Sequence, residues 1–466
     1  MRVTRKLTLP VLLLGIWFVL PATVIRSDEY TISKDTGEDV RSHSKANLSR
    51  EPDVVGLDGA KIPGVCGQAV EAIRMVTFRN NQFHAIPIQI DERNTEGKLV
   101  YPHGTKATKD EDPRFDGNDL LLFVAHDLED QASSERIADL GPLVEEIEVR
   151  DPIDGSKAWG YAVSNQGTPA VSETDYVRYS YVEGKVDSVD AQHYSICYPW
   201  GEYYTDTLSV PHSSGGNGVN FIDRLKARGQ FKFLFSLVSV RITEDKMSSK
   251  VSAYIDGPIR VIRHITYWAN IGFGIRSTSF EADLTYYPCF MQAPLTMRVP
   301  VKMDLFLSEA YADIGSDYNH HAYGMVFTNS NNADGTIIDG RMSPQEKALD
   351  LSMDEWRMVT GPQGTLLRGR MPQCELTRQI KISVHYVDDY RSADPPEQEP
   401  GMIGHVFDRG DILHLRPGVY ETDLLLFIPP YSRDGKHERY LNMEKAPLET
   451  LTRTLHLDQA YPDRFK

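Results

Sequence analysis

Short segments in which apolar and polar residues alternate, each ended by turn-forming residues, constrain the fold of this chain more than any other feature. Residues 83–90 alternate strictly, so that Ile86, Ile88 and Ile90 share one face of an extended strand. Residues 119–125 contain a continuous apolar run of the length expected for a buried strand. Patterns with a period of two predict strands, because successive side chains of a strand point to opposite faces.

Strand-like segments recur along the rest of the chain, whereas segments with helical periodicity are few. The further strand-like segments lie at residues 69–78, 145–150, 158–163, 231–242, 259–268, 295–306, 356–360, 364–369, 379–387 and 420–428. The best helical segments are residues 220–227 and 448–457. Many strands at short spacing favour antiparallel β-sandwiches over a parallel α/β fold. The sequence therefore predicts an all-β protein with few helices.

A stretch rich in Gly, Ser and Pro at residues 164–172 divides the strand-like segments into two groups. We predict a small N-terminal β-sandwich-like domain over residues 54–165 and a larger, supersandwich-like antiparallel domain over residues 170–428. Residues 429–466 are predicted to form a C-terminal tail with a short helix that packs back on the larger domain.

The N-terminus has the pattern of a secretory signal. Basic residues at the start precede an uncharged, mostly apolar run over residues 7–25. We therefore predict a signal peptide at residues 1–27 and export to the periplasm, the cell surface or the extracellular space. If this segment is retained as an anchor instead of being cleaved, it is the protein's only predicted contact with a membrane. The polar residues 28–53 predict a disordered lead.

Four cysteines are present, at Cys66, Cys197, Cys289 and Cys374, and no C-x-x-C motif occurs. The absence of that motif excludes zinc ribbons, thioredoxin-type redox centres and covalent haem attachment. Because an exported chain enters an oxidising compartment, we predict at least one disulfide among the four, with the pairing left open by the sequence. Four buried thiols in a large core are the alternative.

An acidic loop precedes the apolar run at residues 119–125. Its oxygen-bearing side chains include Asp112, Asp116, Asn118 and Asp119, and hard cations such as Ca²⁺ are bound by several oxygen ligands. These four residues are therefore the candidate ligands of a calcium ion, the only cofactor that the sequence suggests. The alternative is an Asx-type turn that starts the strand and is surrounded by solvated acids.

Two segments combine His and Tyr in a way that suits general acid–base catalysis. Tyr318, His320 and His321 lie in a loop between two predicted strands, and His385 and Tyr386 lie near the end of another strand. Neighbouring residues of a regular strand point to opposite faces, so His320 and His321 require an irregular backbone to serve one site. Ordinary polar loops are the alternative for both segments.

Aromatic and basic residues provide candidate substrate contacts. Trp200, Tyr203 and Tyr204 surround a glycine turn, and such side chains can stack against the C–H faces of sugar rings. Arg391, next to the second His–Tyr segment, is a further candidate for substrate binding. In an all-β fold, aromatic residues are also common in the core, which is the alternative interpretation.

Four short segments resemble known protein families. Residues 86–92 (IPIQIDE) and 116–123 (DGNDLLLF) resemble exported bacterial β-sandwich proteins of unassigned function. Residues 256–262 (DGPIRVI) and 354–364 (DEWRMVTGPQG) resemble strand pairs in the supersandwich domains of exo-acting polysaccharide lyases. The resemblance implies a β-sandwich fold and carbohydrate-related activity, but no catalytic residue of that family can be matched to a position in this sequence.

These features favour an extracytoplasmic carbohydrate-active protein that resembles polysaccharide lyases. If it is a lyase, a Tyr or His removes the proton beside a uronate carboxyl. Its partner is then a polysaccharide or a cell-surface component. A net charge of −16 without a basic stripe argues against a nucleic-acid partner. The alternatives are a non-catalytic binding or surface-assembly protein and an accessory protein of an extracellular redox system. Nucleophile-elbow, zincin and P-loop motifs are absent from the sequence.

Overall fold

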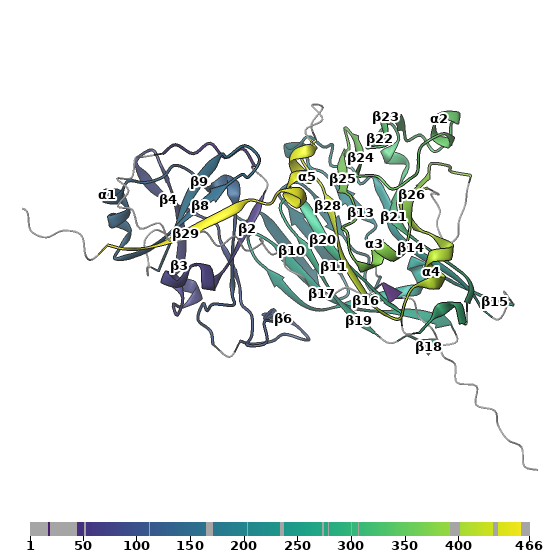
Figure 1. The fold of residues 1–466 in the computed structure, drawn as a ribbon, viewed down its shortest axis with the longest axis horizontal. Helices are drawn as coiled ribbons and strands as arrows, with labels where there is room; N and C mark the ends of the chain where they lie inside the picture. The colour runs from purple at the N-terminus through teal and green to yellow at the C-terminus, as the bar shows by residue number, and fades with distance from the viewer. Residues whose placement is uncertain are drawn as a thin grey trace, which may run out of the picture.

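The computed structural model describes residues 17–18, 44–50, 53–110, 112–164, 171–202, 204–233, 237–272, 275–277, 279–299, 301–305, 307–391, 401–431 and 437–457. These residues form several antiparallel sheets joined by short helices and turns, which confirms the all-β prediction (Figure 1). The predicted signal segment lies outside the described residues except for β1 (Trp17–Phe18). No helix of the described residues combines the length and apolar character needed to cross a membrane.

The N-terminal unit consists of two small sheets with a shared core. Its strands are β2 (Val54–Asp58), β3 (Ile73–Arg79), β4 (Gln82–Ile86), β5 (Gln89–Asp91), β7 (Leu120–Val124), β8 (Leu143–Arg150) and β9 (Lys157–Ser164). One sheet has the order β2-β7-β5, and the other contains β8-β9-β3-β4. A hairpin joins β3 to β4, with Asn80 and Asn81 in the left-handed conformation at φ 51° and 62°. All of β7 is buried, as its apolar run predicts.

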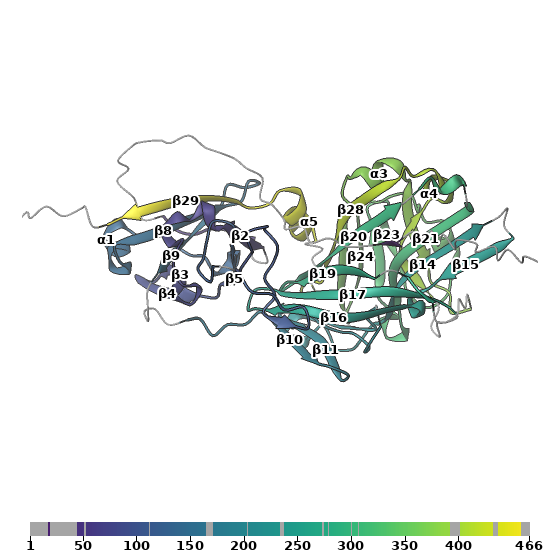
Figure 2. The same cartoon turned by 90° about the horizontal axis from the view of Figure 1, so that it is seen from below.

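The C-terminal segment joins this N-terminal unit. β29 (Glu449–His456) pairs antiparallel with β8 and extends the sheet that β8 begins (Figure 2). The helix predicted over residues 448–457 is therefore wrong, because alternate threonines favour a strand and the free edge of β8 supplies its partner. The Thr452 hydroxyl donates to the carbonyl oxygen of Lys61 at 2.6 Å. A short helix does occur in the tail, as α5 (Glu438–Lys445).

The larger part of the molecule is built on one antiparallel sheet whose strands differ in length, and we call it the large sheet. Its order is β23-β22-β24-β25-β28-β20-β19-β17-β16-β6, with β1 and β18 paired at its sides. These strands are β6 (His103–Gly104), β16 (Met247–Asp256), β17 (Val261–Gly272), β18 (Ile275–Arg276), β19 (Phe280–Tyr286), β20 (Phe290–Val299), β22 (Val326–Asn329), β23 (Asn332–Ile337), β24 (Trp356–Gly361), β25 (Gly364–Gly369) and β28 (Gly418–Phe427).

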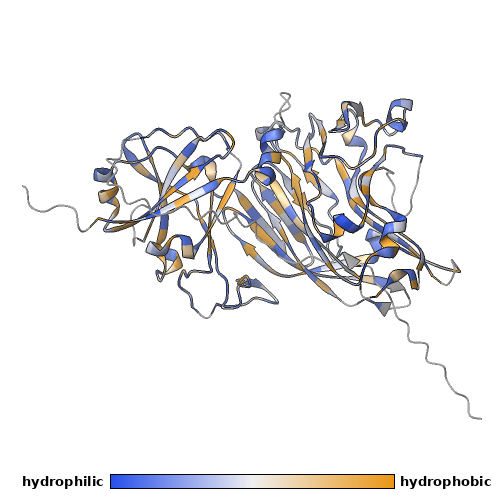
Figure 3. Ribbon diagram, viewed as in Figure 1, coloured by the Kyte–Doolittle hydropathy of each residue, from blue (hydrophilic) through white to orange (hydrophobic). Residues whose placement is uncertain are grey.

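A second sheet faces the large sheet, and the main hydrophobic core lies between them. Its order is β15-β14-β21-β27-β26, formed by β14 (Ile222–Phe233), β15 (Val238–Ile242), β21 (Leu307–Tyr318), β26 (Ile382–Val387) and β27 (Met402–Phe407). The helix predicted over residues 220–227 is wrong, because that segment is extended in β14 and pairs with β21. Hydrophobic and hydrophilic positions alternate along these strands (Figure 3), as expected when each sheet buries one face.

The remaining strands form a smaller sheet that shares the core of this sandwich. A four-stranded sheet contains β10 (Val177–Val182), β11 (Val186–Ala191), β12 (Ser195–Cys197) and β13 (Thr207–Ser209). The other helices of the described residues are α1 (Ser134–Ile137), α2 (Pro344–Lys347), α3 (Glu375–Gln379) and α4 (Arg409–His414). All of them are short.

Candidate functional site

The outer face of the large sheet carries a polar site where the sheet meets the N-terminal unit. Val261 and Ile265 of β17 point into the core between the two large sheets. Because successive side chains along a strand point to opposite faces, Arg260 and the next even-numbered residues face away from that core. In Figure 1 this region lies between the N-terminal unit and the sandwich, with α5 above it.

A pocket of 640 Å³ opens at this meeting point, and we call it the junction pocket. Strands β20 and β28 supply its floor, together with Arg260 just before β17 and Tyr287 just after β19. Strands β2 and β7 supply one wall, and α5 with residues 370–373 supplies another. The polar side chains of the floor and of α5 that line it are Arg260, Tyr287, Gln292, Asp423, Glu444 and Lys445. Phe290 and Phe427 add aromatic surface beside them. Such a mixed lining, mostly apolar with a few polar groups, is typical of small-molecule sites.

A buried ion pair fixes the floor of the pocket. The Arg260 Nε atom donates to Asp91 Oδ2 at 2.7 Å, and its Nη1 atom donates to the Tyr287 hydroxyl oxygen at 2.8 Å. The Gln89 side-chain oxygen accepts the backbone N–H groups of Ile259 and Arg260 at 3.1 and 2.8 Å. Since Asp91 and Gln89 belong to β5, these contacts fasten the N-terminal unit to the large sheet.

Two carboxyl groups in the junction pocket have altered acidity. Burial raises the pKa of Glu444 to about 7, although the positive charges of Arg368 and Lys445 oppose this effect. Burial also raises the pKa of Asp423, but a hydrogen bond from Gln292 favours its ionised form. The two acids therefore sit in different environments within one pocket, an arrangement typical of acid–base pairs.

A second set of charges secures the end of α5. Arg50 bonds Asp53 through Nη2 at 3.2 Å and Asp151 through Nε at 3.5 Å, and Nη2 also donates to the Ala446 carbonyl at 2.5 Å. Arg50 and Asp53 are 4% and 5% exposed. The disordered lead predicted over residues 28–53 is therefore wrong at its C-terminal end, because these side chains find buried partners that sequence cannot reveal.

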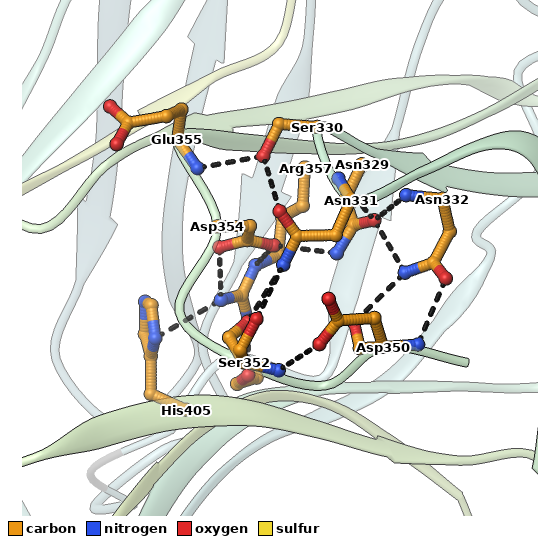
Figure 4. A network of polar contacts seen from close by, with 11 residues as sticks. Asn329, Ser330, Asn331, Asn332, Asp350, Ser352, Asp354, Glu355, Arg357 and His405 are labelled. Carbon is orange, nitrogen blue, oxygen red and sulfur yellow. Dashed lines mark hydrogen bonds and ion pairs between the residues drawn. The ribbon is translucent and has the colours of Figure 1, made fainter. Parts of the chain in front are cut away.

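A network of polar contacts beneath the sheet holds the two large sheets together (Figure 4). Arg357 of β24 donates through Nε and Nη2 to the Asp354 carboxylate at 3.1 and 2.8 Å, and its Nη2 lies 3.1 Å from His405 Nδ1 of β27. Burial and the nearby arginines lower the pKa of His405, which keeps it neutral. The Asn329 amide completes the network by donating to Asp354 at 3.0 Å. This network connects the two sheets through hydrogen bonds between buried side chains.

The structure brings the predicted residues Tyr318, His320 and His321 close together. A turn of 3₁₀ helix at His320–Ala322 begins where Asn319 accepts the His321 N–H, and the two imidazole rings are 4.0 Å apart. This is the irregular backbone that the sequence required. Both histidines line a 360 Å³ pocket together with Tyr204, and His320 and Tyr318 also line a neighbouring pocket of 180 Å³.

The other predicted catalytic pair does not join that group. His385 lies on one face of β26, with Nδ1 3.7 Å from Asp313 Oδ2. Tyr386 points the opposite way into the core, where its hydroxyl donates to Glu346 Oε1 at 2.7 Å. Since Tyr386 is only 4% exposed, it does not present its hydroxyl to the surface.

The predicted substrate contacts are divided between different places. Trp200 is 44% exposed and packs beside Tyr181, with ring centroids 5.9 Å apart. Tyr204 lies near the histidine pair, whereas Tyr203 is outside the described residues. Arg391 is exposed and donates to the Tyr390 hydroxyl at 3.1 Å.

The acidic loop adopts the Asx-turn arrangement. The buried Asp119 carboxylate accepts the backbone N–H groups of Arg93 and Asp116 at 2.8 and 2.9 Å, and Asp116 accepts the Asn118 N–H at 2.8 Å. Asp112 accepts the Arg114 N–H at 3.2 Å. In the described part of the chain, no cluster of three or more His, Cys, Asp or Glu side chains is arranged to hold a metal ion. The calcium ion stays a prediction.

No disulfide joins any of the four cysteines, so the structure does not contain the predicted disulfide. The reason is that the four residues belong to separate parts of the fold. Cys66 donates to the Gly59 carbonyl at 3.2 Å in the N-terminal unit, and Cys197 lies in β12. Cys289 is buried beside the aromatic floor of the junction pocket, and Cys374 precedes α3.

Sequence reasoning missed the junction pocket, although a signal for part of it was present. Asp91 and Arg260 fall in two of the segments that carry family resemblances, and a charged residue within the apolar segment 259–262 calls for a buried partner. No local pattern distinguishes Asp423 or Glu444, because their altered acidity arises only when α5 and the N-terminal unit cover the sheet.

Comparisons with known proteins do not assign this chain to a family. No protein-family model matches it, and no curated protein matches it. Among solved structures, the chain is similar to an α-mannosidase from Enterococcus faecalis V583, with a TM-score of 0.45 and 8% identity. The match covers 88% of this chain and spans 46% of the length of the mannosidase chain.

Proposed function

We propose that the junction pocket binds a neutral sugar unit and catalyses hydrolysis of its glycosidic bond. The observation that carries this proposal is the pair of carboxyl groups, Glu444 and Asp423, with raised pKa values in one 640 Å³ pocket. Most glycoside hydrolases use two carboxyl groups, one as a proton donor and the other as a nucleophile or base.

The environments of the two acids suggest their roles. Glu444, with a pKa of about 7, keeps its proton near neutral pH and is suited to protonate the leaving oxygen. Burial raises the pKa of Asp423 as well, but the hydrogen bond from Gln292 opposes this effect, and we assign Asp423 the role of base or nucleophile. Tyr287, Phe290 and Phe427 provide aromatic surface for the apolar faces of a sugar ring.

The charge balance of the pocket favours a neutral sugar over a uronate. Arg260 faces Asp91, and Arg370 at the rim donates to Glu355 at 2.5 Å. Both guanidinium groups lining the pocket thus already have acidic partners, and the third cation of the lining, Lys445, acts on the neighbouring Glu444. A uronate needs a cation to balance its carboxylate. Lyase chemistry on a uronate remains the second candidate, because it is the activity implied by the family resemblance. The basic, apolar start of the chain supports our further proposal that the protein is exported.

The test is an activity assay on a panel of neutral and uronate-containing polysaccharides, followed by substitution of the two acids. We expect reducing-end release from a neutral polymer, and a rate loss on the order of 10²–10⁴ in Glu444→Gln with substrate binding retained. His320→Ala, which changes the other candidate site, is the matched control and should keep the wild-type rate.

Three outcomes would contradict this assignment. Products with an ultraviolet-absorbing double bond would establish a lyase instead of a hydrolase. Loss of activity in His320→Ala but not in Glu444→Gln would move the chemistry to the histidine pocket. Binding without turnover of any polymer on the panel would favour a non-catalytic binding protein.

A further inference from the structure

A second pocket lies at the same junction. It has a volume of 500 Å³ and shares no lining residue with the junction pocket. Helix α5 supplies a residue to each pocket, because Arg439 lines this second one and Glu444 lines the junction pocket. We call the second one the basic pocket, since His126, His193 and Arg439 all line it.

Arg439 is the strongest donor in the basic pocket. Its Nη2 atom donates to the Tyr440 hydroxyl oxygen at 2.8 Å, and its Nε atom is buried with no hydrogen-bond partner among the described residues. A buried guanidinium N–H without a partner is costly, and an oxyanion would satisfy it with a charge-assisted hydrogen bond.

His193 is placed to add a second donor. Its Nδ1 atom lies 2.8 Å from the Ser214 hydroxyl oxygen, which is also 3.4 Å from the Gln192 carbonyl oxygen. In the tautomer in which the hydroxyl donates to Nδ1, the ring proton is on Nε2. Burial lowers the pKa of His193 to about 4, and the positive charges of His126 and Arg439 add to this effect. These effects place His126 and Arg439 within electrostatic reach of His193.

The acids near the pocket are already engaged. Glu129 is the one carboxylate among the described lining residues, and Arg79 donates to it at 3.3 Å. Asp127, which adjoins His126, accepts the Tyr176 hydroxyl at 2.8 Å. With these charges matched, Arg439 gives the pocket a positive potential near neutral pH.

We propose that the basic pocket binds a small oxyanion, a carboxylate or sulfate group, through the Arg439 guanidinium and the Nε2–H of His193. An arginine fork matches the paired oxygens of such groups. This site stands independently of the proposed hydrolase, because no residue of it belongs to the junction pocket. Free anions and anionic groups on sugars share this chemistry.

The experiment is calorimetric titration of the full chain with sodium sulfate and, separately, sodium acetate, at constant ionic strength balanced with sodium chloride. We expect a dissociation constant on the order of 1 mM for at least one of them. Arg439→Gln should weaken binding at least tenfold. Lys445→Gln removes an equal charge from the same helix, outside this pocket, and should leave the affinity unchanged.

Histidine NMR provides an independent measurement. The bound anion should raise the pKa of His193 above about 4, because it balances the neighbouring positive charges. If Arg439→Gln fails to fold, His193→Gln carries the same affinity test. Three results would overturn the proposal. They are equal anion affinity in wild type and Arg439→Gln, a loss of affinity in Lys445→Gln as large as that in Arg439→Gln, and no saturable binding of either anion.

Discussion

Asp91 Oδ2 lies 2.7 Å from Arg260 Nε, and this contact connects a strand of the N-terminal unit to the floor of the junction pocket. Both side chains are almost completely buried, at 1% and 4% exposure. A buried pair of this kind contributes to specificity more than to net stability, because desolvation offsets much of the attraction. The position of the N-terminal unit on the large sheet therefore depends on this pair.

Breaking the pair should be costly. We expect Asp91→Ala to lower the free energy of unfolding by about 3–5 kcal/mol, because it leaves a buried guanidinium without its carboxylate. The exposed pair of Arg370 and Glu355 is the control, and Arg370→Gln should cost less than about 1 kcal/mol. Urea denaturation of the three proteins measures both values, and equal costs would refute the assigned role of burial.

The acidity of Glu444 predicts a pH-dependent stability. Its pKa is about 7 in the folded protein and 4.5 ordinarily, so the folded state binds the proton more tightly. Stability therefore falls as pH rises from about 4.5 to about 7. Between pH 5 and pH 8, the free energy of unfolding of the wild type should therefore decrease relative to that of Glu444→Gln. A constant difference across this range would show that the pKa is not raised.

The same pKa predicts the pH dependence of the proposed hydrolysis. A general acid must hold its proton, so kcat/KM should decline as pH rises through about 7, the pKa of Glu444. The measurement is a pH–rate profile on whichever neutral polymer proves to be the substrate. If the decline of kcat/KM at alkaline pH is unchanged in Glu444→Asp, a group other than Glu444 donates the catalytic proton.

Two leucines at β29 should differ sharply in their effect on stability. Leu448 is 8% exposed and packs in the core of the N-terminal unit, whereas Leu451 is 41% exposed. Leu448→Ala is expected to cost about 2–4 kcal/mol through lost burial and a cavity. Leu451→Ala is expected to cost less than about 1 kcal/mol. Chemical denaturation of both variants tests whether this strand is part of the folded unit.

The thiols provide a direct chemical check. Because the four cysteines are separate in the fold, alkylation after denaturation without reductant should label all four. In the native protein Cys289 should react slowest, since it is fully buried and burial raises the pKa of its thiol. Mass spectrometry counts the labels, and a pair of unreactive sulfurs that appears only after reduction would establish a disulfide.

Local patterns predict the strands well, and for a physical reason. Residues 119–125 show their burial directly in the sequence and contain the buried strand β7. Residues 83–90, predicted as one strand, are instead divided between β4 and β5, which belong to different sheets. Residues 220–227 and 448–457 fail because their extended form depends on pairing with β21 and β8, which no local window contains.

The candidate site was harder to foresee. The proximity of His320 and His321 follows from a loop near the end of a strand, which sequence can suggest. The junction pocket requires three distant segments to meet, and the acidity of Glu444 exists only after that assembly. Arg260 carried a sequence signal, but its partner Asp91 lies 169 positions away.

The pairing of β29 with β8 has a consequence for the order of folding. Glu449 pairs with Arg150, so the outermost strand of the first-synthesised unit comes from the far end of the chain. A ribosome producing about 5–20 residues per second needs about 15–60 s to cover the intervening chain. During that interval the edge of β8 is uncovered and available to other strands, which makes early chaperone binding at this edge an advantage.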